Sequence, residues 1–156
     1  MRLSPVELGL LTLAAVVVAT TVPRCGPGRP VVRAHWDWTP GVLNAAVTQA
    51  TIASTICRRG WTRTIRPPVD YTNALKQRQL RRYGLHGPPS AYQEDHLISL
   101  ELGGDPADPR NLWPEPYPRA SAVDQLENDL NHRVCTGSLT LADAQRRESA
   151  LKHRDG

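Results

Sequence analysis

The stretch EDHLISLELGGDPADPRNLWPEP, residues 94–116, constrains the fold more than any other part of the chain. The segment Tyr92–Leu102 has an apolar, alternating pattern typical of a strand. The segment Gly103–Pro106 has turn chemistry, and Asn111–Trp113 predicts a short strand that returns antiparallel. The prolines that follow predict irregular chain over 114–119. The pattern therefore predicts a small β-hairpin.

Helical patterns flank this hairpin. Asn44–Cys57 predicts a helix capped by Asn44, and Thr72–Tyr83 predicts a second that ends at Gly84. Between them, the alternation of Trp61–Arg66 predicts a short strand before Pro67-Pro68.

The C-terminal part predicts a helical hairpin. A capping box of Ser121 and Asp124 opens the first helix, which ends at Thr136-Gly137. A second capping box, Thr140 and Asp143, opens the second helix. The predicted class is thus α+β.

The N-terminal apolar segment Leu8–Val22 carries no charge. It is shorter than the roughly 20 residues of a membrane span but suits the core of a signal peptide. We expect residues 1–24 to direct export to the medium or the cell envelope, with an uncleaved membrane anchor as the alternative. Residues 25–43 are rich in Pro and Gly and predict a linker arm, and 44–156 predict one domain, expected to be a monomer.

An exported protein can form disulfides. Of the three cysteines, Cys25 lies in the linker, whereas Cys57 and Cys135 end two predicted helices. We therefore predict a Cys57–Cys135 bond, which would contribute about 4 kcal/mol by constraining the unfolded chain.

The net charge of +4 is the sum of a basic segment and an acidic segment of the chain. Residues 58–82 contain one acid and eight basic residues: Arg58, Arg59, Arg63, Arg66, Lys76, Arg78, Arg81 and Arg82. Residues 94–129 contain nine acids and two arginines. Such a division is usual for a solvated surface with ion pairs, but it also suits a phosphate-binding face beside a cation-binding pocket.

The motif DHLISLELGG…NLWPEP resembles the HNH endonuclease superfamily, and specifically its small exported members with DHLIxLELGG…NLWPEPY. The resemblance covers roughly residues 66–153. It implies a ββα-metal core at about 92–136, with flanking helices and the helical hairpin, and a metal-dependent nuclease activity. Members of this superfamily carry a His or Asn metal ligand near the start of the core helix, where this chain has Ser121 and Ala122.

The residue types of the motif suit phosphodiester hydrolysis. His96 has an ordinary pKa near 6.5 and could take a proton from the attacking water. Asp95 is a hard oxygen donor that could hold a divalent cation. Neighbouring residues of an ideal strand face opposite sides, so both reach one site only if the strand twists or bulges. Asn111 would bond main chain across the loop and orient His96.

The helix that follows should supply the remaining metal ligand. Its helical wheel places Val123, Leu126, Leu130 and Val134 on the core face. The adjacent flank carries the candidate ligands, with Asp124 preferred and Glu127 or Asn128 next, while His132 faces outward.

We expect an exported nuclease that cleaves DNA or RNA with little sequence preference and uses Mg²⁺, Mn²⁺ or Zn²⁺. The basic stretch would contact the phosphate backbone. The alternative is a non-catalytic exported protein that keeps the scaffold and binds nucleic acid or another polyanion. A membrane would be a partner only if the N-terminal segment is retained.

Overall fold

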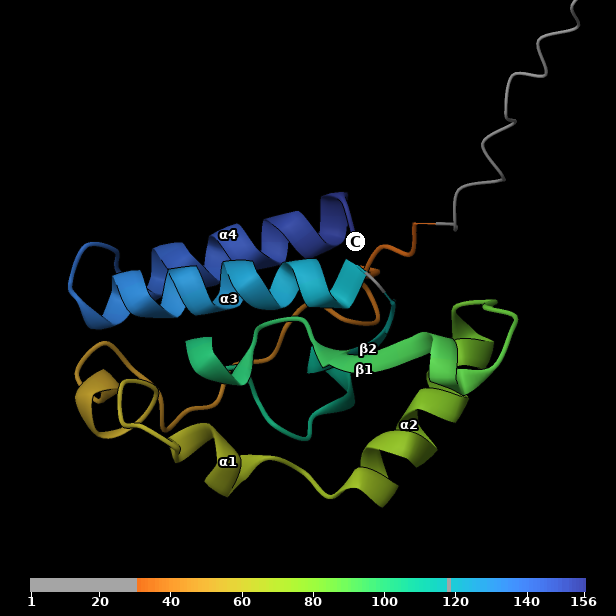
Figure 1. The fold of residues 1–156 in the computed structure, drawn as a ribbon, viewed down its shortest axis with the longest axis horizontal. Coiled ribbons are helices and arrows are strands. Elements are labelled where there is room, and N and C mark those ends of the chain that lie inside the picture. Colours follow the sequence, from red (N-terminus) through yellow and green to blue (C-terminus); the bar gives the residue numbers. More distant parts are fainter. Residues whose placement is uncertain (1–30, 118) are drawn as a thin grey trace, which may run out of the picture.

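The computed structural model describes residues 31–117 and 119–156, which form an α+β fold (Figure 1). Its helices are α1 (Trp61–Ile65), α2 (Val69–Arg82), α3 (Arg119–Cys135) and α4 (Leu141–Arg154), and its strands are β1 (Tyr92–His96) and β2 (Leu112–Pro116). The signal-peptide prediction falls on residues 1–24, outside the described part. None of the described helices has the length and apolar character needed to cross a membrane.

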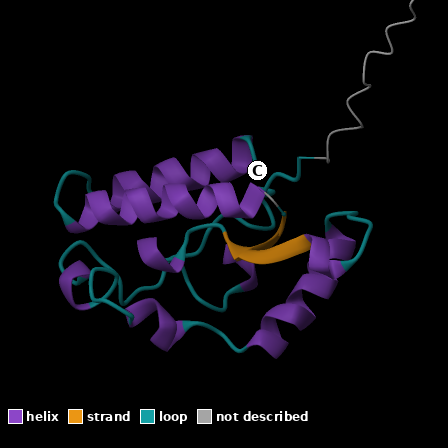
Figure 2. Ribbon diagram, viewed as in Figure 1, coloured by secondary structure: helices purple, strands orange, loops and turns teal. Residues whose placement is uncertain are grey.

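The two strands form an antiparallel hairpin as predicted, but β1 ends at His96 instead of Leu102, and Leu100–Leu102 form a 3₁₀ helix. Asp95 pairs with Trp113 and His96 with Leu112. Helix α2 packs against both strands, and α3 packs against β2. In Figures 1 and 2 the hairpin accordingly lies between α2 and the α3–α4 pair.

The predicted helical hairpin at the C-terminus is confirmed. Helices α3 and α4 run side by side (Figure 1). The side chain of Thr140 accepts a hydrogen bond from the Asp143 N–H at 3.1 Å, which confirms the second capping box. The turn therefore returns the last residues of α4 to the start of α3, beside the β-hairpin.

Two apolar clusters hold these layers together. One cluster packs α3 and α4 against the irregular segment 44–57 and the loop that follows β1, through Val47, Ile98, Leu130 and Ala144 among others. The other packs α2 and the N-terminal arm against the β-hairpin, around the fully buried Trp113. The β-hairpin is consequently held from both sides.

Two expected elements between residues 44 and 66 were wrong. Residues 44–57 form turns and one short 3₁₀ helix, Ile52–Ser54, instead of an α-helix. Threonine hydroxyls compete for the main chain there: Thr51 donates to the Ala46 carbonyl at 2.8 Å and Thr55 donates to the Thr51 carbonyl at 2.7 Å. The predicted strand Trp61–Arg66 is wrong, because Trp61–Ile65 form helix α1. A short alternating run without a partner strand does not define a strand.

Other boundaries also differ from the sequence prediction. Helix α3 begins at Arg119, so Ser121 lies inside the helix and caps nothing. Strand β2 continues to Pro116, although the prolines predicted irregular chain. Both strands of a two-stranded hairpin are edge strands, where a proline can occupy positions whose N–H would point away from the partner. His153 is buried under Trp36, and its Nε2 lies 2.9 Å from the Thr39 carbonyl.

The predicted disulfide is present. Cys57 and Cys135 are bonded, with their Cα atoms 5.5 Å apart. The bond joins residues 78 positions apart and fastens the irregular segment before α1 to the end of α3. The disulfide, and not a regular helix or strand, therefore restrains that segment.

The double variant Cys57→Ser/Cys135→Ser should lose about 4 kcal/mol of unfolding free energy, because the unfolded chain regains the entropy of a long loop. Urea denaturation monitored by circular dichroism measures the loss. Cys25→Ser is the matched control and should leave stability within about 0.5 kcal/mol. A double variant as stable as the control would contradict this role.

Candidate active site

A polar cavity of about 340 Å³ opens where the end of β1 meets α3. Its lining residues come from four parts of the chain and include both members of the Asp-His pair: Arg66, Gln93, Asp95, His96, Ser99, Leu100, Glu101, Asp124, Glu127 and Asn128. The structure thus brings Asp95, His96, Asp124, Glu127 and Asn128 together, as a site requires. Arg66 joins them from the basic stretch.

His96 is anchored through one nitrogen of its ring. Its Nε2 lies 3.0 Å from the Pro106 carbonyl, which can only accept, so Nε2 carries the proton. In the neutral ring, Nδ1 then keeps the lone pair. Burial lowers the pKa of His96, against the raising effects of the Pro106 carbonyl and Asp95. His96 is therefore a neutral imidazole at pH 7 with a defined basic nitrogen.

Asn111 fastens the loop that carries the Pro106 carbonyl. Its amide donates to the carbonyls of Ile98 at 3.0 Å and Asp105 at 2.9 Å, and its oxygen accepts from the Ile98 N–H at 2.9 Å. The side chain is fully buried. A Cβ atom on Gly104 would lie 1.8 Å from the Ile98 carbonyl oxygen and 2.5 Å from the Asn111 amide, so this close approach requires glycine. Asn111 thereby holds the loop against which His96 bonds.

Lys152, near the end of α4, lies fully buried among the carboxylates of the site. Its Nζ is 3.0 Å from Asp95 Oδ2, 2.7 Å from Glu127 Oε1 and 3.3 Å from Glu148 Oε1. It also donates to the His96 carbonyl at 2.5 Å. Neither Lys152 nor Glu148 was predicted from the sequence to belong to the site. Their spacing of four residues on one helix was the signal that they pair with each other.

Two neighbours bond to Asp95. Its Oδ2 accepts from Lys152, and its Oδ1 accepts from the Gln93 amide at 3.2 Å. Although burial raises the pKa of Asp95, the adjacent Lys152 ammonium outweighs it and leaves this pKa below its ordinary value. Asp95 is therefore an ionised carboxylate at neutral pH.

Two further carboxyl groups of the β-hairpin are buried. Burial raises the pKa of Glu94 to about 8, and burial together with the charge of Asp95 raises that of Glu115 to about 8. Neither carboxyl group has a hydrogen-bond partner among the described residues, so no hydrogen bond offsets the cost of ionising it. Both groups are thus largely neutral below pH 8.

The three helix candidates differ in their surroundings. Asp124 lines the cavity, and desolvation and the charge of Asp95 raise its pKa. Asn128 is exposed and donates to the Asp124 carbonyl of its own helix at 2.7 Å. Glu127 is bonded to Lys152. Asp124 is consequently the helix carboxylate that remains available to a ligand in the cavity.

The side-chain donors of the cavity suit some metal ions better than others. Within residues 31–117 and 119–156, no three His, Cys, Asp or Glu side chains form a group that could hold a metal ion. A zinc site needs three or four such ligands. Magnesium keeps several waters and takes one or two carboxylates together with substrate phosphates. Asp95 and Asp124 therefore fit Mg²⁺ or Mn²⁺ better than Zn²⁺.

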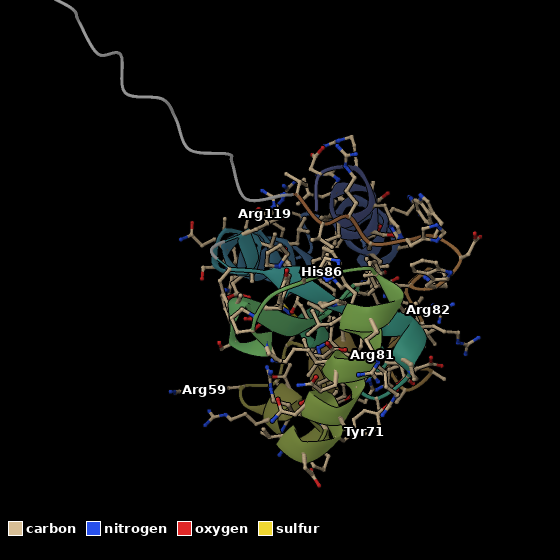
Figure 3. All side chains as sticks on the ribbon, turned by 90° about the vertical axis from the view of Figure 1, so that its right-hand side faces the viewer. Arg59, Tyr71, Arg81, Arg82, His86 and Arg119 are labelled. Atoms are coloured by element: carbon tan, nitrogen blue, oxygen red, sulfur yellow. A yellow bond between two sulfur atoms is a disulfide. The ribbon has the colours of Figure 1, made fainter. Side chains whose placement is uncertain are left out.

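The basic stretch does not gather at this cavity. Only Arg66 of its eight residues lines the cavity. Lys76 donates to the Tyr92 carbonyl at 3.1 Å, and the Arg82 guanidinium lies 4.8 Å from the centre of the Trp38 ring. Arg59 and Arg82 extend on opposite sides of the molecule in Figure 3. Arg58, Arg59, Arg63, Arg78 and Arg81 are exposed, so the basic stretch forms a broad surface instead of one groove.

Comparisons of the chain with protein-family models, with curated proteins and with solved structures found no match. The resemblance to the HNH superfamily accordingly rests on the residues of the motif. The orienting role of Asn111 and the metal roles of Asp95, Asp124, Glu127 and Asn128 stay predictions.

Asn111→Ala should destabilise the fold by about 3 kcal/mol, because three buried main-chain groups lose their partner. Asn128→Ala removes an exposed amide from the same site and should change stability by less than about 0.5 kcal/mol. Chemical denaturation of both variants gives the comparison. Equal stabilities would show that the Asn111 hydrogen bonds do not hold the loop.

Stability should also depend on pH through Glu94 and Glu115. Their pKa values in the folded protein exceed the ordinary 4.5, so their contribution is complete below about pH 4.5 and is lost as pH rises to about 8. We expect the free energy of unfolding to fall by about 1 kcal/mol or more between pH 5 and pH 8.

Glu115→Gln should flatten this dependence, because an amide does not titrate between pH 5 and pH 8. Urea titrations of the protein and of this variant, at intervals of half a pH unit, measure the effect. If the free energy of unfolding of the variant falls with pH as steeply as that of the unmodified protein, Glu115 does not contribute to the pH dependence.

Proposed function

We propose that the protein is a metal-dependent phosphodiester hydrolase of the HNH type that acts on nucleic acid with little sequence preference. The observation that carries the proposal is the anchored His96. Its protonated Nε2 bonds the Pro106 carbonyl, which leaves a basic Nδ1 in a polar cavity beside an ionised Asp95.

His96 acts as the general base. A neutral imidazole accepts a proton from a water molecule as that water attacks phosphorus. The Pro106 carbonyl fixes the tautomer and stabilises the positive ring that forms, because Nε2 already donates to it. Asn111 keeps that carbonyl in place through the Asp105 main chain.

Asp95 and Asp124 would hold a divalent cation of the Mg²⁺ or Mn²⁺ kind. Such an ion supplies charge neutralisation at the phosphate and the leaving oxygen. Desolvation first, and the charge of Asp95 second, raise the pKa of Asp124, and a bound cation would favour its ionised form against both effects. Glu127 adds little negative charge, because burial raises its pKa well above the ordinary value and its carboxyl group bonds Lys152.

Arg66 suits the substrate phosphate. It lies at the cavity and bears a charge opposite to that of the surrounding carboxylates. The exposed arginines of 58–81 extend this positive surface beyond the cavity and would contact the backbone of a longer strand. Contacts of this kind carry no base information, which supports cleavage with little sequence preference.

The test is cleavage of plasmid DNA and of single-stranded RNA by the purified protein in Mg²⁺, Mn²⁺ or Zn²⁺, with a chelator as the metal control. We expect activity in Mg²⁺ or Mn²⁺, lost on chelation. His96→Ala should lower kcat at least about 100-fold, the usual contribution of a general base. His86→Ala replaces an exposed histidine away from the cavity and should retain activity.

Absence of cleavage with every metal would contradict the proposal. If the protein then binds DNA with an affinity that falls steeply with salt, the basic surface functions without catalysis. Where the protein does cleave, Arg66→Ala should lose activity even at saturating substrate, whereas replacement of an outer arginine such as Arg81 should mainly weaken binding.

A further inference from the structure

Building on this proposed function, we propose that Lys152 is a positioning residue of the active site. Its ammonium group holds the side chain of Asp95 and the main chain of His96 in the arrangement that turns both residues toward one cavity. Helix α4, which lies outside the strand–strand–helix unit, would thereby become part of the site.

Consecutive residues pose a geometric problem at the end of β1. Side chains of neighbouring residues on a strand point to opposite faces. Asp95 and His96 nevertheless both line the cavity. The strand pairing of His96 with Leu112 does not by itself place both side chains at one cavity, so a further contact is needed to hold them there.

Lys152 supplies such a restraint. Its Nζ donates to the Asp95 side chain at 3.0 Å and to the His96 carbonyl at 2.5 Å. One buried cation thus bonds the side chain of one residue and the main chain of the next. Lys152 is not among the cavity-lining residues, so it would act through Asp95 and His96 and not on the substrate.

Fold stability alone is a weak explanation for this lysine. Burying an ammonium among carboxylates carries a desolvation cost that the ion pairs often only offset, and apolar residues of similar volume commonly stabilise as well. An apolar residue at this position could not bond the Asp95 side chain or the His96 carbonyl. These two bonds therefore explain why a charged residue is found here.

Glu148 provides a matched control. Like Lys152, it is fully buried, and its carboxylate accepts from the Ser99 N–H at 3.0 and 3.1 Å and lies 3.3 Å from Lys152. It does not line the cavity. Glu148→Gln therefore disturbs the same buried cluster while leaving the bonds from Lys152 to Asp95 and His96 in place.

The first experiment compares Lys152→Met with Glu148→Gln in full-length protein at a temperature where circular dichroism shows both folded. Lys152→Met should lower kcat about 100-fold, as expected for a misplacement of the reacting groups by about 1 Å. Its KM should change less than about threefold, because the substrate phosphate contacts other side chains. Glu148→Gln should keep kcat within about threefold even if its melting temperature falls. Equal kcat losses in both variants would overturn the proposal in favour of a purely structural role.

A double-mutant cycle tests whether Lys152 acts through Asp95. Asp95→Asn and Lys152→Met should each lower kcat, and the double variant should lose less than the product of the two single losses, because part of the effect of Lys152 passes through Asp95 and the rest through the His96 main chain. Multiplicative losses would show that Lys152 acts independently of Asp95 and would contradict the positioning role.

A measurement independent of cleavage separates this proposal from the proposed function. ¹⁵N NMR of the neutral His96 ring reports its tautomer. The unmodified protein and Glu148→Gln should show the single Nε2–H form, whereas Lys152→Met should show a mixture of tautomers, because a displaced His96 main chain carries the ring away from the Pro106 carbonyl. A single Nε2–H form in Lys152→Met would overturn the proposal whether or not the protein cleaves nucleic acid. Absence of cleavage by the unmodified protein would overturn the proposed nuclease function but not the role of Lys152 in positioning His96.

Lys152→Met leaves three carboxylates without their cation and could fail to fold. Lys152→Met/Glu148→Gln removes one of these charges without touching Asp95 or His96. The kcat and tautomer measurements are then made on this variant against Glu148→Gln alone. Loss of both kcat and the single tautomer supports the proposal, and retention of both overturns it.

Discussion

The buried ammonium of Lys152 is the interaction on which the rest of the site depends. It joins the last turns of α4 to α3 through Glu127 and to β1 through Asp95 and the His96 main chain. Without it, three acidic side chains would lie buried close together with no opposite charge. The fold therefore uses one long side chain to bring together segments that are far apart in the sequence.

The loop between the strands performs a second, complementary task. Asn111 bonds main chain on both sides of this loop, and the loop in turn supplies the carbonyl that holds His96. Lys152 restrains the strand end from one side and the loop restrains the imidazole from the other. The proposed base is consequently fixed in tautomer and orientation by groups that would not contact the substrate.

Much of the architecture could be predicted from the sequence, because short-range patterns decide it. The turn chemistry after Leu102 predicted the β-hairpin, and the 3.6-residue periodicity with Thr140 as a cap predicted the helical pair. The disulfide followed from the positions of Cys57 and Cys135. Prediction failed at 44–57 and 61–66, where threonine side chains and the lack of a partner strand decide the conformation.

The sequence by itself determined which chemical groups are present and their local setting: a carboxylate and an imidazole on a strand, and a following helix with acids on one flank. That the strand ends at His96 came from the structure. Only the tertiary structure decided how these groups are used. Asp124 remains open to the cavity, while Lys152 takes up Glu127 and part of Asp95. The reason is physical: a local pattern indicates which face of an element is buried, but the charge that neutralises a buried carboxylate comes from whichever distant residue the packing brings within bonding distance.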